Sequence, residues 1–489
     1  MPFSEHALFN VEGAIALAFL AALFARSVRG KTAPASICGG EFLFAAVTIA
    51  VAAWLAFAPI LRAPFLYDDY THIRDAAHFT WVSVGRQFGP VAGRGLFFRP
   101  VGFFLYWLNY LWAGANPVWW HASSIALHVA CSCLVYALGR EIGVSRWAAT
   151  GGALLFVLTG LTAETVGWID ARFDLMTTLA VLCCLLCVCR YAATARGRWL
   201  VSALAIGVAG MLCKESGFCL PLLIACLALF IDERRRVLRA AGWAAIVAVV
   251  LIAYRLWALH GIGGYGAHFQ VIRTVEALLL RQWAILFFPF NWSAPASKLM
   301  YAAMAAIPLV LAGCAWMSRP RRRALAGSIL FVIVAALPVE HLLLLGPSIG
   351  GSRELYLGSV GWALLWAVVL DGMPRRAAMI GACLAAAISL PILEHNLRVW
   401  GQTAEMAKSV CAEFGKIAAE TAGPMIVRGL PASRMGVVFL NNGFPQCVEM
   451  NSGVPANRII AGDPAATPPG AHQFTWNEAT GRLDEVPRR

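Results

Sequence analysis

The stretch EFLFAAVTIAVAAWLAFAPILRAPFLYDDYTHI, residues 41–73, decides the fold class, because a long apolar run is followed within a few residues by two adjacent carboxylates, Asp68 and Asp69. A run of about 20 apolar residues is what an α-helix needs to cross the bilayer core. Charged groups close to membrane depth are costly and usually functional. This stretch therefore predicts a membrane span and a polar site at its end.

Further apolar runs of similar length recur along the 489 residues, of which 60% are hydrophobic and 13% are charged. A soluble globular chain is nearer half apolar and a quarter charged. Open sheets leave backbone groups unsatisfied in lipid, and these runs are too long for barrel strands. We therefore predict an all-α, polytopic helical membrane protein with about 12 transmembrane helices plus interfacial helices. The apolar runs lie near residues 11–25, 41–61, 117–139, 148–166, 175–190, 199–214, 217–231, 240–258, 301–317, 324–343, 356–370 and 376–392.

Every second connection between these runs is basic, which predicts by the positive-inside rule that those connections face the cytoplasm. They hold Arg26, Arg29, Lys31, Arg140, Arg146, Arg190, Arg196, Arg198, Arg234, Arg235, Arg236, Arg239, Arg319, Arg321, Arg322, Arg323, Arg375 and Arg376. All other connections and both termini then face outward. The formal net charge of +13 is concentrated in these short segments, and no nucleic-acid-binding motif is visible, so we predict no nucleic-acid partner.

Two parts of the chain are expected, a transmembrane domain over residues 1–393 and a small extracytoplasmic region over residues 394–489. The first large outward loop, residues 62–116, contains the carboxylate pair and the aromatic stretch VGFFLYWLNYLW, which is typical of an interfacial helix. Segment 259–300 is predicted to be interfacial or re-entrant. The C-terminal region is rich in Pro, Gly, Asn and Thr and carries two β-like runs, MIVRGL and MGVVFLN.

The fourteen cysteines fall into two groups. Most lie within apolar runs, where cysteine packs as a small hydrophobe, and the run from Cys183 to Cys189 contains no His or carboxylate that would favour a metal site. Cys411 and Cys447 lie in the polar tail. If that tail is extracytoplasmic, the two can form a disulfide.

Charged side chains gather in the outward connections, at about the same depth. Carboxylates suit general base catalysis or metal binding, whereas Lys and Arg suit phosphate recognition. A membrane-boundary site with both kinds of group favours a phosphorylated lipid and a hydroxyl acceptor as ligands. The candidates are Asp68, Asp69, Arg99, Glu164, Asp170, Arg172, Asp174, Lys214, Glu215, Arg255, Arg353 and the adjacent Glu354.

Simpler interpretations of these charges remain open. Glu164, Arg172 and Asp174 can pair with one another and hold two helix ends together, since buried charges usually find partners. The Lys214–Glu215 hinge can be a solvated turn, and the carboxylate pair can be an ordinary helix cap.

Six motifs follow one another along the chain: FLYDDYTHI, FFRPVGFFLYWLNYLWAGANPVWWHASSIALHV, LTAETVGWIDARFDLM, CKESGFCLP, SRELYLGSVG and HNLRVW. In this order they resemble the C-type glycosyltransferase superfamily, and within it the branch of the protein O-mannosyltransferases. The resemblance runs from about residue 50 to Trp400. It implies a large multi-span helical fold and an enzyme that transfers a sugar from a polyprenyl-phosphate carrier to an acceptor hydroxyl, with inversion at the anomeric carbon.

The same resemblance implies roles for individual residues. Asp68 corresponds to the leading acid of the first motif and is the candidate general base, while Asp69 would orient the acceptor or contribute to a metal site. Whether a divalent cation such as Mg²⁺ or Mn²⁺ is needed stays open, and Asp68 or Asp69 would be its ligand. Arg172 and Asp174 would shape the sugar pocket.

Lys214 and Arg353 would bind the carrier phosphate. Relatives often have Tyr after that arginine, where this chain has Glu354. The other candidates for substrate contact are Arg99, Glu164, Asp170, Glu215 and Arg255.

The resemblance leaves the sugar and the acceptor open, the acceptor being a protein, lipid A, O-antigen or another glycan. We expect a multi-pass protein of a bacterial inner (cytoplasmic) membrane whose active site faces the periplasm. Two alternatives use the same carriers: a transporter or flippase of lipid-linked sugars, and an oligosaccharide ligase or polymerase. Transporters usually carry inverted repeats and charges at mid-depth, whereas here the charges crowd one boundary and no repeat is visible.

Overall fold

The computed structural model describes residues 39–90, 96–261, 263–264, 275–287, 289, 306, 313, 321–342, 350–464 and 468–486. Within these ranges, seven helices are long and apolar enough to span a membrane. Their helical cores are α2 (Gly39–Phe57), α6 (Pro117–Glu141), α9 (Arg172–Thr194), α12 (Arg234–Leu259), α16 (Arg322–Ala336), α17 (Tyr356–Gly372) and α18 (Arg375–Glu420).

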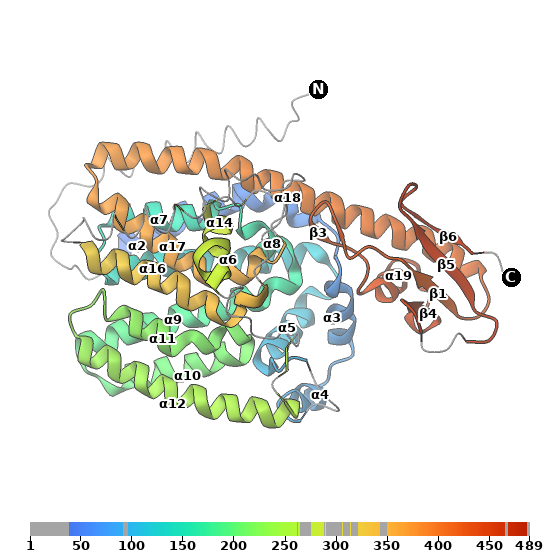
Figure 1. Cartoon of the computed structure of the whole chain (residues 1–489), viewed down its shortest axis with the longest axis horizontal. Coiled ribbons are helices and arrows are strands. Elements are labelled where there is room, and N and C mark those ends of the chain that lie inside the picture. The colour runs from blue at the N-terminus through green and yellow to red at the C-terminus, as the bar shows by residue number, and fades with distance from the viewer. Residues whose placement is uncertain are drawn as a thin grey trace.

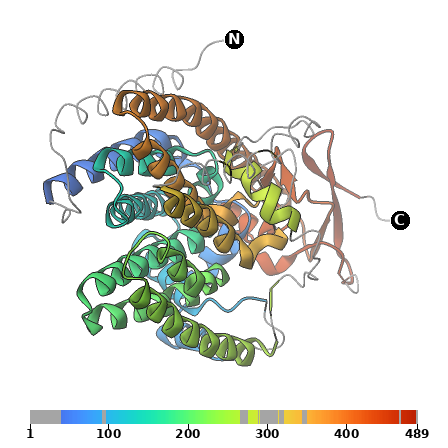
Figure 2. The same ribbon diagram turned by 60° about the vertical axis from the view of Figure 1, so that its left-hand side comes forward.

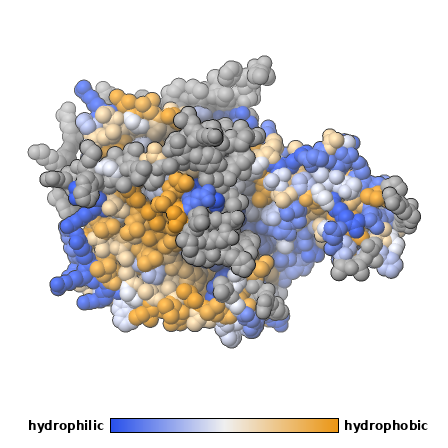
Figure 3. Space-filling view, viewed as in Figure 1, coloured by the Kyte–Doolittle hydropathy of each residue, from blue (hydrophilic) through white to orange (hydrophobic). Residues whose placement is uncertain are grey.

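Shorter apolar helices complete the bundle: α7 (Arg146–Leu158), α10 (Gly197–Cys213), α11 (Leu220–Leu227) and α14 (Gln282–Phe287). The predicted apolar runs 11–25 and 301–317 fall outside the described residues, apart from two single positions, and each of the others is wholly or largely helical where it is described. Apolar side chains cover the middle of the bundle, whereas hydrophilic ones cover the C-terminal region and the opposite end (Figure 3). The prediction of a polytopic helical membrane protein is therefore confirmed.

The predicted span over residues 148–166 is interrupted. Helix α7 ends at Leu158, and a turn leads into α8 (Thr162–Gly167) and the 3-10 helix η2 (Ile169–Ala171). Gly160 lies in this turn, where a Cβ atom would come within 2.7 Å of the Pro289 carbonyl oxygen. A second break follows α10, because Lys214 is extended and η3 (Glu215–Cys219) precedes α11. These breaks place short polar segments at the end of the bundle.

The outward loop predicted at 62–116 forms three helices beyond η1 (Ala58–Arg62). They are α3 (Asp68–Ala77), α4 (Trp81–Arg86) and the aromatic α5 (Pro100–Ala113), the last over the stretch that predicted an interfacial helix. In Figure 1, α3 lies at the end of the bundle from which α18 continues toward the C-terminus. Two further short helices, η6 (Leu337–Leu342) and η7 (Ser352–Leu355), precede α17. In segment 259–300, the described residues include a π-helical turn over Ala277–Arg281 before α14.

The boundary predicted at residue 393 lies inside a helix. The 46-residue α18 runs from Arg375 to Glu420 without a break. Beyond the apolar part, most of its buried positions follow one another in steps of three and four residues, which is the spacing of one helix face. They are Leu393, Leu397, Trp400, Ala404, Ala407, Cys411, Phe414 and Ala418, and the other buried positions adjoin them. One helix thus connects the membrane bundle to the C-terminal region.

The C-terminal region contains a mixed four-stranded sheet in the order β4-β1-β5-β6. Its strands are β1 (Met425–Arg428), β4 (Ile459–Ala461), β5 (His472–Asn477) and β6 (Arg482–Glu485), with β1 parallel to β4 and β5. A small hairpin pairs β2 (Ser433–Arg434) with β3 (Val437–Val438), so both predicted β-like runs contain strands. In Figures 1 and 2 these strands lie outside the bundle. The all-α class therefore describes the membrane part, to which a small α/β region is attached.

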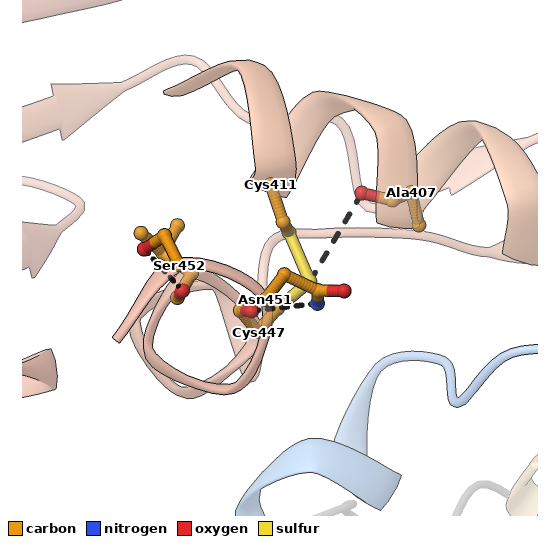
Figure 4. Close-up of a disulfide and its surroundings, with 6 residues drawn as sticks. Ala407, Cys411, Cys447, Asn451 and Ser452 are labelled. Carbon is orange, nitrogen blue, oxygen red and sulfur yellow. Dashed lines mark hydrogen bonds between the residues drawn. A yellow bond between two sulfur atoms is a disulfide. The ribbon is translucent and has the colours of Figure 1, made fainter. Parts of the chain in front are cut away.

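A disulfide joins Cys411 on α18 to Cys447 on α19 (Phe444–Ser452), as shown in Figure 4. Its two cysteines are 36 residues apart in sequence. We expect the Cys411→Ser/Cys447→Ser variant to lower the free energy of unfolding of the C-terminal region by about 3–4 kcal/mol, because the crosslink restricts the unfolded chain. Denaturant unfolding followed by tryptophan fluorescence checks this. An unchanged transition in the oxidised and the reduced protein would contradict it.

Candidate functional site

The carboxylate pair begins helix α3. Tyr67, the residue before it, has a positive φ of 57°, which turns the chain sharply into the helix. Both Asp68 and Asp69 lie in the first helical turn, where the helix dipole favours negative charge. The helix-cap interpretation is wrong, because Tyr67 occupies the N-cap position and no side chain caps the helix, and the two carboxylates point to different surroundings.

Asp69 is a buried anchor between two segments. It is 2% exposed, and its Oδ2 accepts a hydrogen bond from the Leu66 N–H at 3.0 Å. Its Oδ1 accepts one from the Asp170 N–H at 2.8 Å. Because both oxygens are bound to backbone donors, the geometry favours holding α3 against η2 over the predicted contact with an acceptor or a metal.

Asp68 is only partly buried, and its Oδ1 accepts a hydrogen bond from the side-chain amide of Asn442 in the C-terminal region. Burial and the charge of Asp170 raise the pKa of Asp68 to about 6, against the opposing charges of His72 and Arg353. A carboxylate with such a pKa is ionised at neutral pH and is a stronger base than an exposed one. These are the properties that a general base needs.

His72 lies one helical turn after Asp68 and is paired with Asp170 through its Nδ1. Its ring also packs edge-on against Phe103 and Phe173. Burial acts to lower the pKa of His72, but the charge of Asp170 and its hydrogen bond raise the pKa to about 9. The imidazole is therefore a cation at neutral pH, close to the candidate base.

Arg353 is held by Glu164, with Nη1 2.9 Å from Oε1. The same carboxylate accepts hydrogen bonds from the Ser352 hydroxyl and from the Arg353 N–H, both at 2.9 Å, so Glu164 fixes the whole η7 turn. The Arg353 guanidinium lies over the Trp168 ring, 4.5 Å from its centroid, and Trp168 in turn contacts Tyr67. These contacts place Arg353 beside the start of α3.

Lys214 lies between two buried carboxylates. Its Nζ is 2.7 Å from both Asp174 oxygens and 2.8 Å from Glu354 Oε2. Arg353 approaches the other oxygen of Glu354, with Nε 3.4 Å from Oε1. The predicted phosphate contact of Lys214 therefore competes with two acids that already surround its ammonium group.

Arg99 and Arg255 share one carboxylate. Glu215 accepts hydrogen bonds from Nε and Nη2 of Arg99 at 2.9 and 2.7 Å, and from Nη1 of Arg255 at 2.9 Å. Arg99 also contacts the Phe173 ring, which packs against His72 on another face. Two arginines and one glutamate leave a surplus positive charge beside the His72–Asp170 pair. The Lys214–Glu215 hinge is thus a charged junction and not a solvated turn.

Arg172 lies away from these carboxylates. It is 2% exposed and donates to the hydroxyls of Ser123 and Ser124, at 2.6 and 3.1 Å, while its guanidinium lies 4.5 Å from the Trp120 ring centroid. Because it packs against α6, its contacts favour a structural role over the predicted one in the sugar pocket. The interpretation that Glu164, Arg172 and Asp174 pair with one another is wrong, since each has another partner.

Parts of this chain are similar to known proteins. Residues 99–258 match the dolichyl-phosphate-mannose-protein mannosyltransferase family. This segment runs from Arg99 to the end of α12 and contains Asp170, Lys214, Glu215 and Arg255. The crystal structure of ArnT from Cupriavidus metallidurans bound to undecaprenyl phosphate superposes with a TM-score of 0.50, at 13% identity, over 90% of this chain and 94% of that one.

The chain has the fold of a C-type membrane glycosyltransferase. The predicted likeness to the protein O-mannosyltransferase branch is confirmed as well. Mouse protein O-mannosyl-transferase TMTC1 is 28% identical over 204 residues, which cover 37% of this chain and 21% of the relative. Mouse TMTC4 is 23% identical over 402 residues, which cover 65% of this chain and 54% of the relative. This chain therefore spans only about a fifth of the length of mouse TMTC1.

Two polar residues beside Asp68, His72 and Asn442, were not among the site residues predicted from the sequence. His72 could have been found, because residues four apart lie on one helix face. Asn442 had no such signal, since it is 374 residues from Asp68. At position 354 this chain has Glu where relatives often have Tyr. The ion pair of Glu354 with Lys214 stabilises this acid beside Arg353.

Asp69 is not available to the divalent cation that the resemblance left open. Both of its oxygens accept from backbone N–H groups, and the neighbouring His72 is a cation. Within the described ranges, no three His, Cys, Asp or Glu side chains gather as a metal-binding group.

Proposed function

We propose that this protein is an inverting glycosyltransferase that moves a sugar from a polyprenyl-phosphate carrier to an acceptor hydroxyl on the extracytoplasmic side of the membrane. The observation that carries the proposal is the position of Asp68. It is a partly buried carboxylate with a raised pKa, beside the cations His72 and Arg353, at the boundary of a membrane bundle. The mannosyltransferase family match and the ArnT-like fold support this reaction class.

In this arrangement the reaction is a single displacement at the anomeric carbon. Asp68 accepts the proton of the acceptor hydroxyl as the oxygen bonds to the anomeric carbon, and the bond from that carbon to the phosphate oxygen breaks on the opposite face. The polyprenyl phosphate leaves with the bonding electron pair. Oδ1 of Asp68 is held by Asn442, and Oδ2 accepts no hydrogen bond from the described residues, so Oδ2 is the basic atom.

The leaving phosphate needs cations that are not fully neutralised. Arg99 and Arg255 meet this need better than Lys214, because they share a single carboxylate whereas Lys214 faces two. Arg255 lies near the end of α12, whose neighbouring Leu256 and Trp257 are exposed apolar residues. We therefore assign the phosphate to the two arginines and the polyprenyl tail to the adjacent lipid-facing surface.

The membrane orientation follows from charge and from cysteine chemistry. The basic loops that lead from α11 into α12 and from α17 into α18 lie at the end of the bundle opposite α3 (Figure 1), and the positive-inside rule favours the cytoplasm for that end. The disulfide lies in the C-terminal region, beside α3, and disulfides persist in oxidising compartments. We propose a bacterial inner membrane with the site facing the periplasm, and a protein, lipid A, O-antigen or another glycan as acceptor.

Comparative mass spectrometry of surface glycans and glycoproteins, with and without the gene, tests the function. We expect one defined sugar to disappear from one class of acceptor, and to return when the gene is supplied. Unchanged glycans would contradict the proposal. Loss of a whole class of glycan with accumulation of its lipid-linked precursor would favour a flippase or an oligosaccharide ligase instead.

The pH dependence provides a second test. Only the ionised form of Asp68 accepts a proton, and its pKa is raised to about 6. We therefore expect transfer to be fully active above this pH and to fall as the pH decreases through about 6, with a slope of one proton. Rates in membrane vesicles at saturating donor check this. A rate that stays constant down to pH 4.5 would contradict a base with this pKa.

A further inference from the structure

The C-terminal region reaches the candidate base through a short turn before α19. Asn442 in this turn donates its side-chain amide to Oδ1 of Asp68. The contact joins residues 374 positions apart and lies outside the segment, 99–258, that matches the mannosyltransferase family. The turn therefore contributes to the site from a part of the chain for which the family match offers no role.

The orientation of the Asn442 amide is fixed by its neighbour. The Gly443 N–H donates to Oδ1 of Asn442 at 3.1 Å, so the carbonyl end of the amide is occupied and its NH₂ end faces Asp68. An amide flipped by 180° would place its oxygen against the carboxylate and lose both hydrogen bonds. The pair of contacts thus specifies a donor at this position.

Gly443 allows the close approach that brings Asn442 to Asp68. Its φ is 72°, and a Cβ atom there would lie 2.2 Å from the Tyr67 carbonyl oxygen. The turn therefore packs directly on the backbone that precedes the candidate base, where any other residue is excluded by contact and by conformation.

Helix α19 packs against α3, and an ion pair joins the two helices. Arg74 on α3 and Glu449 on α19 form an ion pair at 2.5 Å. On its other side, α19 is tied to α18 by the disulfide (Figure 4). The turn that carries Asn442 is therefore held from both sides, which is how a precise hydrogen bond is maintained.

We propose that Asn442 is a positioning residue for Asp68, and that the C-terminal region is for this reason an integral part of the active site. It holds Oδ1 so that Oδ2 is aimed at the acceptor hydroxyl. This inference rests on the proposed function, because it assigns a partner to the proposed base. Charged groups around the Asp68 carboxylate are Asp69 and His72 on α3, Asp170 on η2 and Arg353 on η7.

Two variants and one matched control test the proposal. Asn442→Ala removes the donor, and Asn442→Asp replaces it with a second acid. Asn441→Ala is the control, because Asn441 is the adjacent, exposed residue of the same type with no hydrogen bond among the described residues. The assay follows transfer from tritiated undecaprenyl-phosphate mannose to membranes of a strain that lacks the gene.

We expect Asn442→Ala to lower kcat about 10- to 100-fold, as for a reacting group that is slightly misplaced, with the donor KM unchanged. The low-pH side of its pH–rate profile, the acid limb, should move to higher pH, since loss of a donor disfavours the ionised carboxylate of Asp68. Asn442→Asp should show a larger shift in the same direction, and Asn441→Ala should match the wild type.

The outcomes separate this inference from the proposed function. A wild type that transfers no sugar and leaves surface glycans unchanged contradicts the proposed function. An active wild type with an equally active Asn442→Ala variant contradicts only the positioning role. A loss of kcat with an unmoved acid limb in both Asn442 variants would also overturn that role, because it would show that Asn442 only fastens the C-terminal region.

Discussion

Replacing Asp68 by asparagine is expected to lower sugar transfer about 100- to 10,000-fold, the range by which a positioned general base accelerates proton transfer. The amide has nearly the same shape as the carboxylate but cannot accept the proton of the acceptor hydroxyl. The donor KM should change little, because the phosphate is assigned to Arg99 and Arg255 on other helices. Initial rates in membrane vesicles, divided by the amount of folded protein, measure the effect.

Asp75→Asn is the matched control for this substitution. Asp75 lies on the same helix and is exposed, and its charge is the weakest of those that act on His72, so its variant should retain nearly wild-type transfer. Asp69→Asn provides a contrast, because Asp69 accepts from two backbone N–H groups and its loss should reduce the amount of folded protein. Near-normal turnover by Asp68→Asn would remove Asp68 as the base.

Much of the architecture could be predicted from the sequence, because the apolar bilayer core constrains the composition of long stretches of it. A helix must be apolar over its whole span, so nearly every described helix of the bundle was visible as a run. The break at Lys214 was predicted as the hinge between the runs 199–214 and 217–231. The break at Gly160 was not visible, since apolar residues flank it on both sides and only tertiary contacts decide where the helix stops.

The boundary at residue 393 shows a different failure. Composition changes there from apolar to polar, but the step of three or four residues between Leu393 and Ala418 continues without interruption. Periodicity and not composition determines whether a helix continues, because one buried face is sufficient to stabilise it. The pattern was present in the sequence, and composition was given too much weight.

The charged residues of the site could be identified, but their partners could not. A single charged residue beside a membrane span is unusual enough to be recognised in the sequence. Its ion-pair partner cannot be recognised in this way, because the partner depends on the tertiary fold. Lys214 and Glu354 are 140 residues apart, and Asp68 and Asn442 are 374 apart. Lys214 was therefore predicted to bind phosphate as a free cation, although two carboxylates surround it.

Replacing Lys214 by methionine should lower the free energy of unfolding by about 3–5 kcal/mol, because it removes the cation that Asp174 and Glu354 share and leaves only Arg353, beside Glu354, to balance two buried carboxylates. Asp174 and Glu354 are each 4% exposed and Lys214 is 5% exposed, so water cannot compensate. Detergent-induced unfolding, followed by tryptophan fluorescence, measures the change. Lys408→Met is the matched control, since Lys408 is exposed on α18 and its loss should have little effect.

The partner substitutions decide between structure and phosphate binding. Adding Asp174→Asn and Glu354→Gln to Lys214→Met removes the unpaired negative charge, and should restore most of the lost stability, as when a buried ion pair is replaced by neutral groups. If Lys214 serves this network, the triple variant regains stability and keeps a wild-type donor KM. If Lys214 binds the carrier phosphate, as the resemblance implies, stability returns but the donor KM stays raised at least tenfold. That second result would reassign the leaving-group site from Arg99 and Arg255 to Lys214, and with it the position of the donor in the bundle.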